Sequence, residues 1–335
     1  MTNLESYPPH LRHLSHHQPP VPAPEDDGGN STKFLESLPI IDLQNLNHDK
    51  NKLDEACKHW GLFRLVNHGI PPTLLTQLHD QAKQVFSLPF ETKQSSCDGN
   101  PINYFCGSSA LTPSGATITT KLHNTNLFEG FGIHSTQLSL FQHQLPVFES
   151  LRALLVEYGN HTSRIATTLF EAVLKNLDFD QELSKSYITD NTGLFRVYRY
   201  PHCSNSDAGL GLAVHTDSSA LTILNQEDEV SGLEVLRDDQ WLTVKPISNT
   251  LIVNIGDLVQ AISNDRYKSV LHRVKVNKDR VSITYFMYTG EDVKVESSKY
   301  RPFTSNEYLA QIEQDIKAVG HKIGLSRFKL ITVDN

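Results

Sequence analysis

A histidine and an aspartate, His215 and Asp217, stand two positions apart in the stretch GLAVHTDSSALTILNQ, which covers residues 211–226. In an extended strand, residues i and i+2 point to the same face, so both side chains can reach one point. Imidazole nitrogens and carboxylate oxygens are common metal ligands. The pair alone carries little weight, because a shuffled chain with 16 histidines and 38 acidic residues in 335 contains roughly two such pairs by chance.

A third candidate ligand, His272, lies in the strand-like run SVLHRV, far along the chain from the first pair. Two imidazoles and one carboxylate on one side of a metal leave coordination positions open, as in non-haem Fe(II) oxygenases. The same residue types also bind zinc in hydrolases, and each histidine taken singly is compatible with a structural role in the core. Together, His215, Asp217 and His272 predict a metal site.

An arginine and a serine, Arg280 and Ser282, share a strand face shortly after His272. A guanidinium and a hydroxyl group together can hold a carboxylate. An arginine that faces the interior of a β-domain needs an anion. This pair argues against a zinc hydrolase, because hydrolysis gives no reason for a buried clamp that binds a carboxylate.

A β-rich domain must position these side chains. Residues 194–288 contain β-type runs separated by turn residues at spacings of about 8 to 12 residues, which is typical of a barrel or sandwich. The eight runs are LFRVYRY, LAVHTD, SALTILN, GLEVL, WLTVKP, TLIVNI, VLHRVKV and VSITYFMY.

Mostly helical segments precede this domain, and one helix follows it. LPIIDL at 38–43 predicts a strand, and apolar residues at helical spacing predict helices over about 50–60, 71–87 and 146–176, the last broken near Gly159. We expect loops and short strands over 90–125. A final helix begins at a capping box of Thr304 and Glu307 and ends at Gly320.

The composition argues against several classes of protein. Acidic residues outnumber basic ones by 38 to 30 with no basic cluster, so nucleic acid is not an expected partner. No apolar run reaches the roughly 18 residues of a membrane span. The four cysteines form no CxxC pair, which indicates free thiols in a reducing compartment. Residues 1–33 hold six of the 16 prolines and no signal or transit pattern, so we expect a disordered leader and a cytoplasmic protein.

Several motifs resemble those of the plant 2-oxoglutarate-dependent dioxygenases. HTD at 215–217, HR at 272–273 and RVS at 280–282 resemble the iron and co-substrate motifs of this family. NIGD and YRYP match its C-terminal domain, and LPIIDL, WGLFRLVNHGI and VFSLPFETK match its N-terminal region, so the likeness runs from residue 38 to 328. The resemblance implies an α+β protein with a double-stranded β-helix (jelly-roll) core, an N-terminal helical region and a C-terminal helix.

This likeness and the change of pattern divide the chain into four segments. They are the leader 1–33, a mostly helical N-terminal dioxygenase region 34–185, an Fe(II)/2-oxoglutarate jelly-roll domain 186–300, and a C-terminal helix and tail 301–335.

The family resemblance also implies the cofactors and the residues that bind them. Fe(II) would be bound by His215, Asp217 and His272, which form the catalytic centre. The co-substrate 2-oxoglutarate would be held at its distal carboxylate by Arg280 and Ser282 and contacted by Tyr200. Dioxygen would be the second co-substrate, and ascorbate would support activity.

Within the family, YKSVLHRVKVN at 267–277, ITYFM at 283–287 and VGHKIGLSRF at 319–328 resemble gibberellin 2-oxidases, particularly the type that acts on twenty-carbon gibberellins. This implies 2-beta-hydroxylation of a gibberellin, which inactivates the hormone. Three alternatives remain: oxidation of a different gibberellin carbon, oxidation of a flavonoid or other specialised metabolite, and a non-catalytic jelly-roll that binds a metal or ligand.

A rigid apolar acid needs apolar walls and a cationic or hydroxyl anchor. The candidate wall residues are Tyr104, Phe105, Phe131 and Phe286, and the candidate anchors are Lys121, Arg199 and Arg301.

Two positions depart from the family pattern. Tyr198 stands two residues before Tyr200, where the family usually has asparagine, so the hydrogen bonding near the co-substrate differs. Leu127 lies near the place where many relatives carry a tryptophan before an acidic residue, here Glu129. This second change predicts a reshaped wall on the substrate side.

Overall fold

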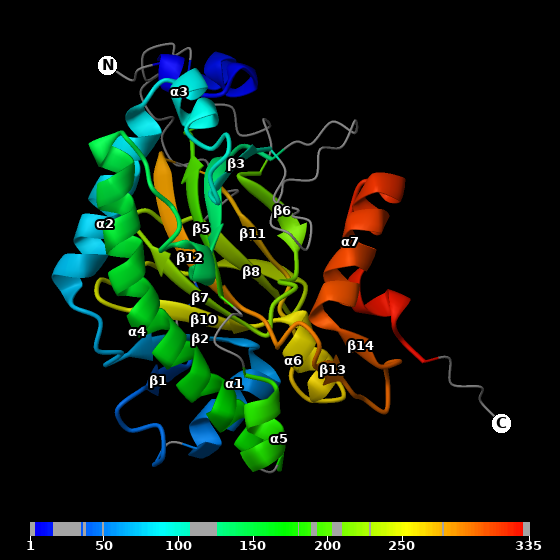
Figure 1. The fold of residues 1–335 in the computed structure, drawn as a ribbon. Coiled ribbons are helices and arrows are strands. Elements are labelled where there is room, and N and C mark those ends of the chain that lie inside the picture. The colour runs from blue at the N-terminus through cyan, green and yellow to red at the C-terminus, as the bar shows by residue number, and fades with distance from the viewer. Residues whose placement is uncertain are drawn as a thin grey trace, which may run out of the picture.

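The computed structural model describes residues 4–15, 35, 38–48, 50–107, 126–179, 181–188, 193–202, 210–227, 229–276 and 278–330. Two β-sheets form the core of the molecule (Figure 1). The larger sheet has the strand order β1-β2-β10-β7-β12-β5-β4-β3, and the smaller one the order β6-β11-β8-β9. This arrangement confirms the predicted α+β class with a jelly-roll core.

All eight β-type runs predicted after residue 193 are strands. They are β5 (Gly193–Tyr200), β6 (Leu212–His215), β7 (Leu221–Gln226), β8 (Leu233–Arg237), β9 (Gln240–Thr243), β10 (Leu251–Ile255), β11 (His272–Val274) and β12 (Arg280–Met287). The N-terminal half adds β1 (Ile40–Asp42), β2 (Leu62–Val66), β3 (Asn103–Cys106) and β4 (Glu129–His134) to the larger sheet.

Strand β12 is central to the larger sheet, because it pairs with β5 on one side and with β7 on the other. Its ladder with β5 is antiparallel and runs without interruption from Arg280 opposite Tyr200 to Met287 opposite Gly193. Since alternate residues of a strand face opposite sides of a sheet, this register decides which side chains of both strands face the same space.

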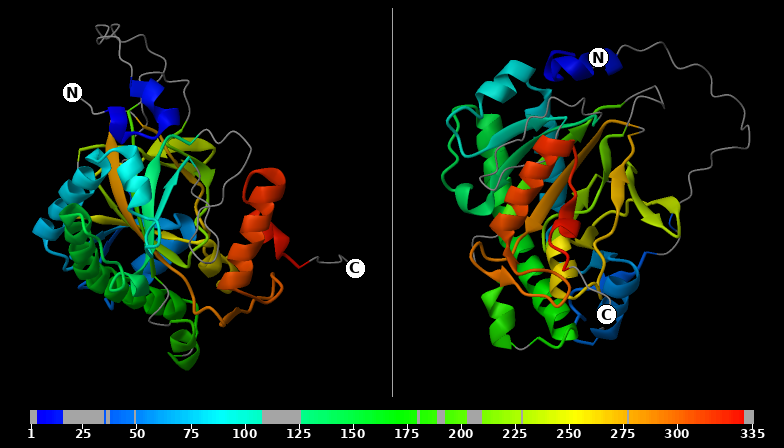
Figure 2. Two further views of the ribbon diagram at one scale, coloured as in Figure 1. Left: turned by 45° about the horizontal axis from the view of Figure 1, so that its top comes forward. Right: turned by 90° about the vertical axis from the view of Figure 1, so that its right-hand side faces the viewer.

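Helices from the N-terminal half cover the outer side of the larger sheet (Figures 1 and 2). Helices α1 (Lys50–His59), α2 (Pro72–Ser87) and α4 (Pro146–Asn176) contact the sheet, α3 (Phe90–Ser95) follows α2, and α5 (Gln181–Ser186) packs against α4. The apolar stripe of α2, formed by Leu75, Leu78, Ala82 and Val85, is buried. In the described part of the chain, no helix combines the length and the apolar character that a membrane span requires.

The predicted break near Gly159 is wrong, because α4 continues through this residue. A Cβ atom placed at Gly159 would lie 3.4 Å from the ring of Phe195 on β5. The glycine therefore allows close packing of the helix on the sheet, and does not end the helix. Gly61, in contrast, has φ +63° and follows the end of α1.

The prediction of a disordered leader is wrong for residues 4–15, which form two short 3-10 helices, Leu4–Ser6 and Pro9–Ser15. Tyr7 and Leu11 are buried in a cluster with Leu127. The spacing of four residues between Tyr7 and Leu11 is a helical signal that the proline content of the segment obscured. Residues 16–34 lie outside the described part of the chain.

A buried charge cluster joins this N-terminal segment to the larger sheet. Glu129 on β4 accepts hydrogen bonds from Lys93 Nζ at 2.5 Å and from Arg199 Nε at 2.5 Å. Both cations also donate to the backbone oxygen of Ser6, at 2.5 Å from Lys93 and 2.8 Å from Arg199. The side chains of Lys93 and Glu129 have no exposed area, so Glu129 is the carboxylate that neutralises two cations in the interior.

We predict that Glu129→Ala lowers the free energy of unfolding by about 3–5 kcal/mol, because it leaves buried cations without their carboxylate. Urea denaturation measures the change. The control is Glu313→Ala, which removes an exposed ion pair with Lys317 and should cost less than about 1 kcal/mol. A loss of similar size in the two variants would contradict this account of the cluster.

The C-terminal segment stands on the side of the barrel opposite α4 (Figures 1 and 2). Helix α7 (Ser305–Val319) begins at the predicted capping box, in which Glu307 N donates to Thr304 Oγ1 at 3.2 Å and Thr304 N donates to Glu307 Oε2 at 2.8 Å. It ends at Gly320 with φ +82°, also as predicted. A short hairpin of β13 (Lys294–Val295) and β14 (Phe303–Thr304) precedes α7.

Candidate functional site: a metal centre beside a buried arginine

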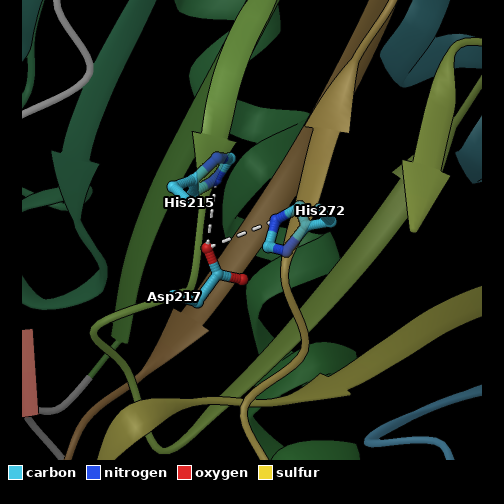
Figure 3. Close-up of side chains that lie close together, drawn as sticks. All are labelled: His215, Asp217 and His272. Atoms are coloured by element: carbon cyan, nitrogen blue, oxygen red, sulfur yellow. Dashed lines mark ion pairs between the residues drawn. The ribbon is translucent and has the colours of Figure 1, made fainter. Parts of the chain in front are cut away.

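The three candidate metal ligands lie together, although they are far apart in the sequence. Strands β6 and β11 are antiparallel neighbours, and their pairing places His215 directly opposite His272. Asp217 lies two residues beyond His215, after the end of β6. Ligand atoms of all three side chains lie within 4.8 Å of one another. Figure 3 shows both imidazoles turned toward the Asp217 carboxylate.

One oxygen of Asp217 faces both histidines. Its Oδ1 atom lies 3.6 Å from His215 Nε2 and 3.7 Å from His272 Nε2. The other oxygen, Oδ2, accepts hydrogen bonds from Thr222 Oγ1 at 2.7 Å and from Asn254 Nδ2 at 2.8 Å. These two bonds hold the carboxylate so that its other oxygen points to the space between the imidazoles.

Backbone carbonyl groups orient the two imidazole rings. His215 Nδ1 lies 2.7 Å from the oxygen of Ala213, and His272 Nδ1 lies 3.0 Å from the oxygen of Val270. A carbonyl oxygen can only accept, so each Nδ1 carries the proton and donates it. This leaves each Nε2 with a lone pair that faces Asp217, which is the orientation that a metal ligand needs.

The protonation states also suit a metal site. Burial and the neighbouring His272 lower the pKa of His215 to about 3. Burial raises the pKa of Asp217, but the two histidines and the hydrogen bonds from Asn254 and Thr222 outweigh it and bring the pKa to about 2. At neutral pH, His215 is therefore a neutral imidazole and Asp217 a carboxylate, the forms that bind a divalent cation.

A cavity of about 760 Å³ contains this cluster and extends between the two sheets. Arg280 and Ser282 from β12 and Tyr200 from β5 line it together with the three candidate ligands. Arg280 lies opposite Tyr200 in the strand ladder, and its guanidinium carbon is 5.3 Å from the centre of the Tyr200 ring. The structure thus brings together all six residues that the motifs indicated.

Arg280 is a buried cation in need of an anion. It is 2% exposed, and its Nε and Nη2 atoms have no hydrogen-bond partner among the described residues. Unpaired buried charges are very unfavourable, so a site of this kind is built for an anionic ligand. The residues therefore fit a metal bound by His215, Asp217 and His272 and a carboxylate held by Arg280 beside it.

Of the four predicted wall residues, Phe286 lines the cavity. Tyr104, Phe105 and Phe131 are absent from its lining, which corrects their assignment. Tyr104 donates to Glu129 in the buried charge cluster, and Phe131 packs against Phe86 and Phe148. Phe105 lies behind Tyr198, with ring centres 5.5 Å apart.

Two of the three candidate anchors, Arg199 and Arg301, also lie elsewhere. Arg199 alternates with Tyr198 and Tyr200 on β5, so it faces the other side of the sheet and binds Glu129. Arg301 is exposed and covers the Phe328 ring at 4.1 Å. Lys121 lies outside the described residues. Leu127, expected on the substrate side, packs against the N-terminal segment and is not part of the cavity lining.

One cation of the cavity that the sequence did not reveal is Arg196. It lines the cavity, and its guanidinium carbon lies 5.5 Å from the ring centre of Phe105 and 5.5 Å from that of Phe286. Its Nη1 atom donates to Tyr198 Oη at 3.0 Å. The unusual tyrosine therefore orients this arginine. The signal was available, because residues 196, 198 and 200 share one face of a strand.

Family models match two parts of the chain. Residues 191–289 match the 2OG-Fe(II) oxygenase superfamily, and residues 38–143 match the N-terminal region described as non-haem dioxygenase in morphine synthesis. The first match contains the whole cluster of candidate ligands together with Arg280 and Ser282.

Plant relatives are similar over most of their length. Gibberellin 2-beta-dioxygenase 8 of Arabidopsis thaliana is 34% identical, with 87% of this chain and 86% of the relative covered. Gibberellin 2-beta-dioxygenase 5 of Oryza sativa subsp. japonica is 35% identical, with 87% of each covered. Jasmonate-induced oxygenase 1 of Arabidopsis thaliana is 32% identical, with 81% of this chain and 71% of the relative covered.

Solved structures share the fold. The crystal structure of JOX2 in complex with 2OG, Fe and JA superposes with a TM-score of 0.74 at 28% identity, covering 88% of this chain and 89% of that one. The structure of the dioxygenase for auxin oxidation in rice gives a TM-score of 0.71 at 26% identity, covering 88% of this chain and 100% of that one.

Proposed function

This chain belongs to the 2OG-Fe(II) oxygenase superfamily, and we propose that it hydroxylates a gibberellin at the 2-beta position, which would inactivate the hormone. Its cofactors are Fe(II), 2-oxoglutarate and dioxygen. One observation carries the oxygenase assignment to particular residues. Buried Arg280, with two guanidinium nitrogens that have no hydrogen-bond partner among the described residues, lies in the same cavity as the facing His215, Asp217 and His272.

In this proposal, His215, Asp217 and His272 hold Fe(II), and Arg280 and Ser282 hold the distal carboxylate of 2-oxoglutarate beside Tyr200. Fe(II) held by these residues would supply the activation of dioxygen needed to convert 2-oxoglutarate to succinate and carbon dioxide and to place one oxygen atom on a substrate carbon. The protein's own part is to orient the substrate and to exclude water from the cavity. No side chain is needed as a general base.

Arg196 is the proposed anchor for a substrate carboxylate. It lines the cavity with apolar side chains from both sides, among them Leu194 and Phe286 from the larger sheet and Leu309 and Ile316 from α7. A cation beside apolar side chains suits a rigid hydrocarbon skeleton that carries an acid group. This is the chemical character of a gibberellin, and the gibberellin 2-beta-dioxygenases among the relatives support that choice.

We predict that Arg196→Leu raises the KM for the acid substrate about 10-fold or more, because a charge-assisted pair contributes ~1.5–3 kcal/mol. The measurement compares the acid with its methyl ester. The wild type should prefer the acid, and the variant should treat both alike. Arg196→Lys keeps the charge and is the control. If Arg196→Leu retains the full preference for the acid, Arg196 is not the anchor.

The test of the function is a screen of the purified protein with Fe(II), 2-oxoglutarate and ascorbate. The panel contains nineteen- and twenty-carbon gibberellins, jasmonic acid, indole-3-acetic acid and flavonoids, and mass spectrometry follows each compound. The proposal expects one added oxygen atom on a gibberellin, at carbon 2, with one succinate formed per product. Loss of two hydrogens would instead indicate desaturation.

A second candidate substrate is a jasmonate-type acid. It is supported by the similarity to jasmonate-induced oxygenase 1 and to the JOX2 complex, and Arg196 suits a single carboxylate equally well. Oxygen added to jasmonic acid and to no gibberellin would replace the gibberellin proposal. Binding of 2-oxoglutarate without succinate formation on any compound would favour the non-catalytic alternative.

A further inference from the structure

The segment VGHKIGLSRF, residues 319–328, contains a lysine that reaches the metal-ligand loop. After α7 ends at Gly320, the chain turns back, and residues 320–323 line the cavity. The Lys322 side chain is 17% exposed. Its Nζ atom donates to the backbone oxygen of Thr216 at 2.9 Å, to Thr216 Oγ1 at 3.1 Å and to Ser218 Oγ at 3.0 Å.

These contacts fall on either side of a candidate ligand. Thr216 is the residue between His215 and Asp217, and Ser218 follows Asp217. Asp217 lies beyond the end of β6, so the strand ladder does not hold it. Bonds from Lys322 to both neighbours of Asp217 restrict the backbone on which its carboxylate is carried.

A buried carboxylate fixes the ammonium group of Lys322 in this place. Asp257 is 3% exposed, forms an ion pair with Lys322, and accepts a hydrogen bond from Tyr308 Oη of α7 at 2.6 Å. Its own backbone N donates to the backbone oxygen of Asp217 at 2.8 Å. Asp257 therefore connects the C-terminal segment to the same loop by a second route.

The turn after α7 is shaped for this lysine. Gly324 has φ +73°, and a Cβ atom there would lie 3.2 Å from Lys322 Cε and 3.3 Å from Tyr308 Oη. Glycine at this position allows the backbone to pass close to the aliphatic part of Lys322 and to the phenol of Tyr308, both of which interact with Asp257.

We propose that Lys322 is a positioning residue for the metal centre: it fixes the 216–218 loop and thereby the direction of the Asp217 carboxylate. This inference rests on the metal site of the proposed function. Groups that orient metal ligands from outside typically change metal affinity by 10- to 100-fold when they are removed. The same segment walls the cavity, so the C-terminal tail contributes to both metal binding and the substrate site.

The test measures the binding of Mn(II) alone to the full chain, by the loss of the free-ion EPR signal and without turnover. Lys322→Met should raise the Kd for Mn(II) about 10-fold. Lys317→Met is the matched control, because Lys317 lies on α7, is 60% exposed and pairs only with Glu313 among the ion pairs described. Its Kd should equal that of the wild type.

Lys322→Met alone leaves the buried carboxylate of Asp257 without its cation. A double variant, Lys322→Met with Asp257→Asn, removes that charge, so it separates the loss of positioning from the destabilising effect of an unpaired buried carboxylate. It should bind Mn(II) as weakly as Lys322→Met, because the bonds to Thr216 and Ser218 are still absent. Circular dichroism at the assay temperature confirms that each variant is folded.

The results distinguish the two proposals. If the wild type binds no Mn(II), or if His215→Ala binds Mn(II) as tightly as the wild type, the metal site itself is wrong. If the wild type binds and the folded double variant binds within twofold of it, Lys322 does not position the site. A lower melting temperature with an unchanged Kd would assign Lys322 a purely structural role.

Discussion

Asp217→Ala should abolish both turnover and Fe(II) binding, the largest effect that we expect from any single substitution in this protein. Asp217 is the only anion in the cluster, and its Oδ1 atom faces the Nε2 atoms of both histidines at 3.6 and 3.7 Å. The substitution leaves two neutral imidazoles, which hold a hard, oxygen-preferring cation much less well. It also removes the acceptor of the Thr222 and Asn254 hydrogen bonds.

Asp217→Asn separates charge from shape. The amide is nearly isosteric and retains one oxygen, but it lacks the negative charge that binds the metal. Succinate formation and Mn(II) binding are measured for both variants, with Asp238→Ala as the control because Asp238 is 91% exposed. We expect both Asp217 variants to lose activity and the control to keep it. More than a tenth of wild-type turnover in Asp217→Ala would exclude Asp217 as a required ligand.

Arg280→Ala should raise the KM for 2-oxoglutarate by about 10-fold to more than 100-fold. The side chain is buried, and two of its nitrogen atoms have no partner in the described structure, so a bound carboxylate would gain charge-assisted hydrogen bonds that contribute ~1.5–3 kcal/mol. Because the metal ligands are unchanged, kcat at saturating 2-oxoglutarate should fall much less than kcat/KM.

Thermal melting gives a readout of the same prediction without turnover. A ligand that binds only the folded state raises the melting temperature by mass action. In the presence of Mn(II), 2-oxoglutarate should stabilise the wild type and the control Arg237→Ala, whose guanidinium lies on the surface over Trp60, but not Arg280→Ala. Equal stabilisation of all three proteins would show that Arg280 does not bind the co-substrate.

Local patterns in the sequence determined much of the fold. The eight β-type runs, the stripe of α2 and the capping box at Thr304 each depend on residues within a few positions of one another, so their signals survive without tertiary information. The errors have a common cause. Glycine stands at position 159 within a continuous helix because the Phe195 ring of β5 packs against the helix there. Tyr7 and Leu11 belong to the folded part of the chain because they pack with Leu127, which is distant in the sequence.

The chemical identity of the site was also available in the sequence, because it depends on residue type and on alternation within a strand. That reasoning brought out His215, Asp217, His272, Arg280 and Ser282. What only the tertiary structure decided is the convergence of these residues: the pairing of β6 with β11 places two histidines opposite each other. The register of distant strands follows from the packing of the whole core, and no local period encodes it.

The same reason explains why the sequence missed Arg196 and Lys322 and put forward Arg199 and Arg301 among its candidate anchors. The residue type shows that a side chain is a cation. Which group it binds depends on the element that packs against it in the folded chain. Arg199 meets Glu129, whereas Arg196, on the opposite face of the same strand, lines the cavity. Lys322 meets the ligand loop only because α7 and its turn fold back across the barrel.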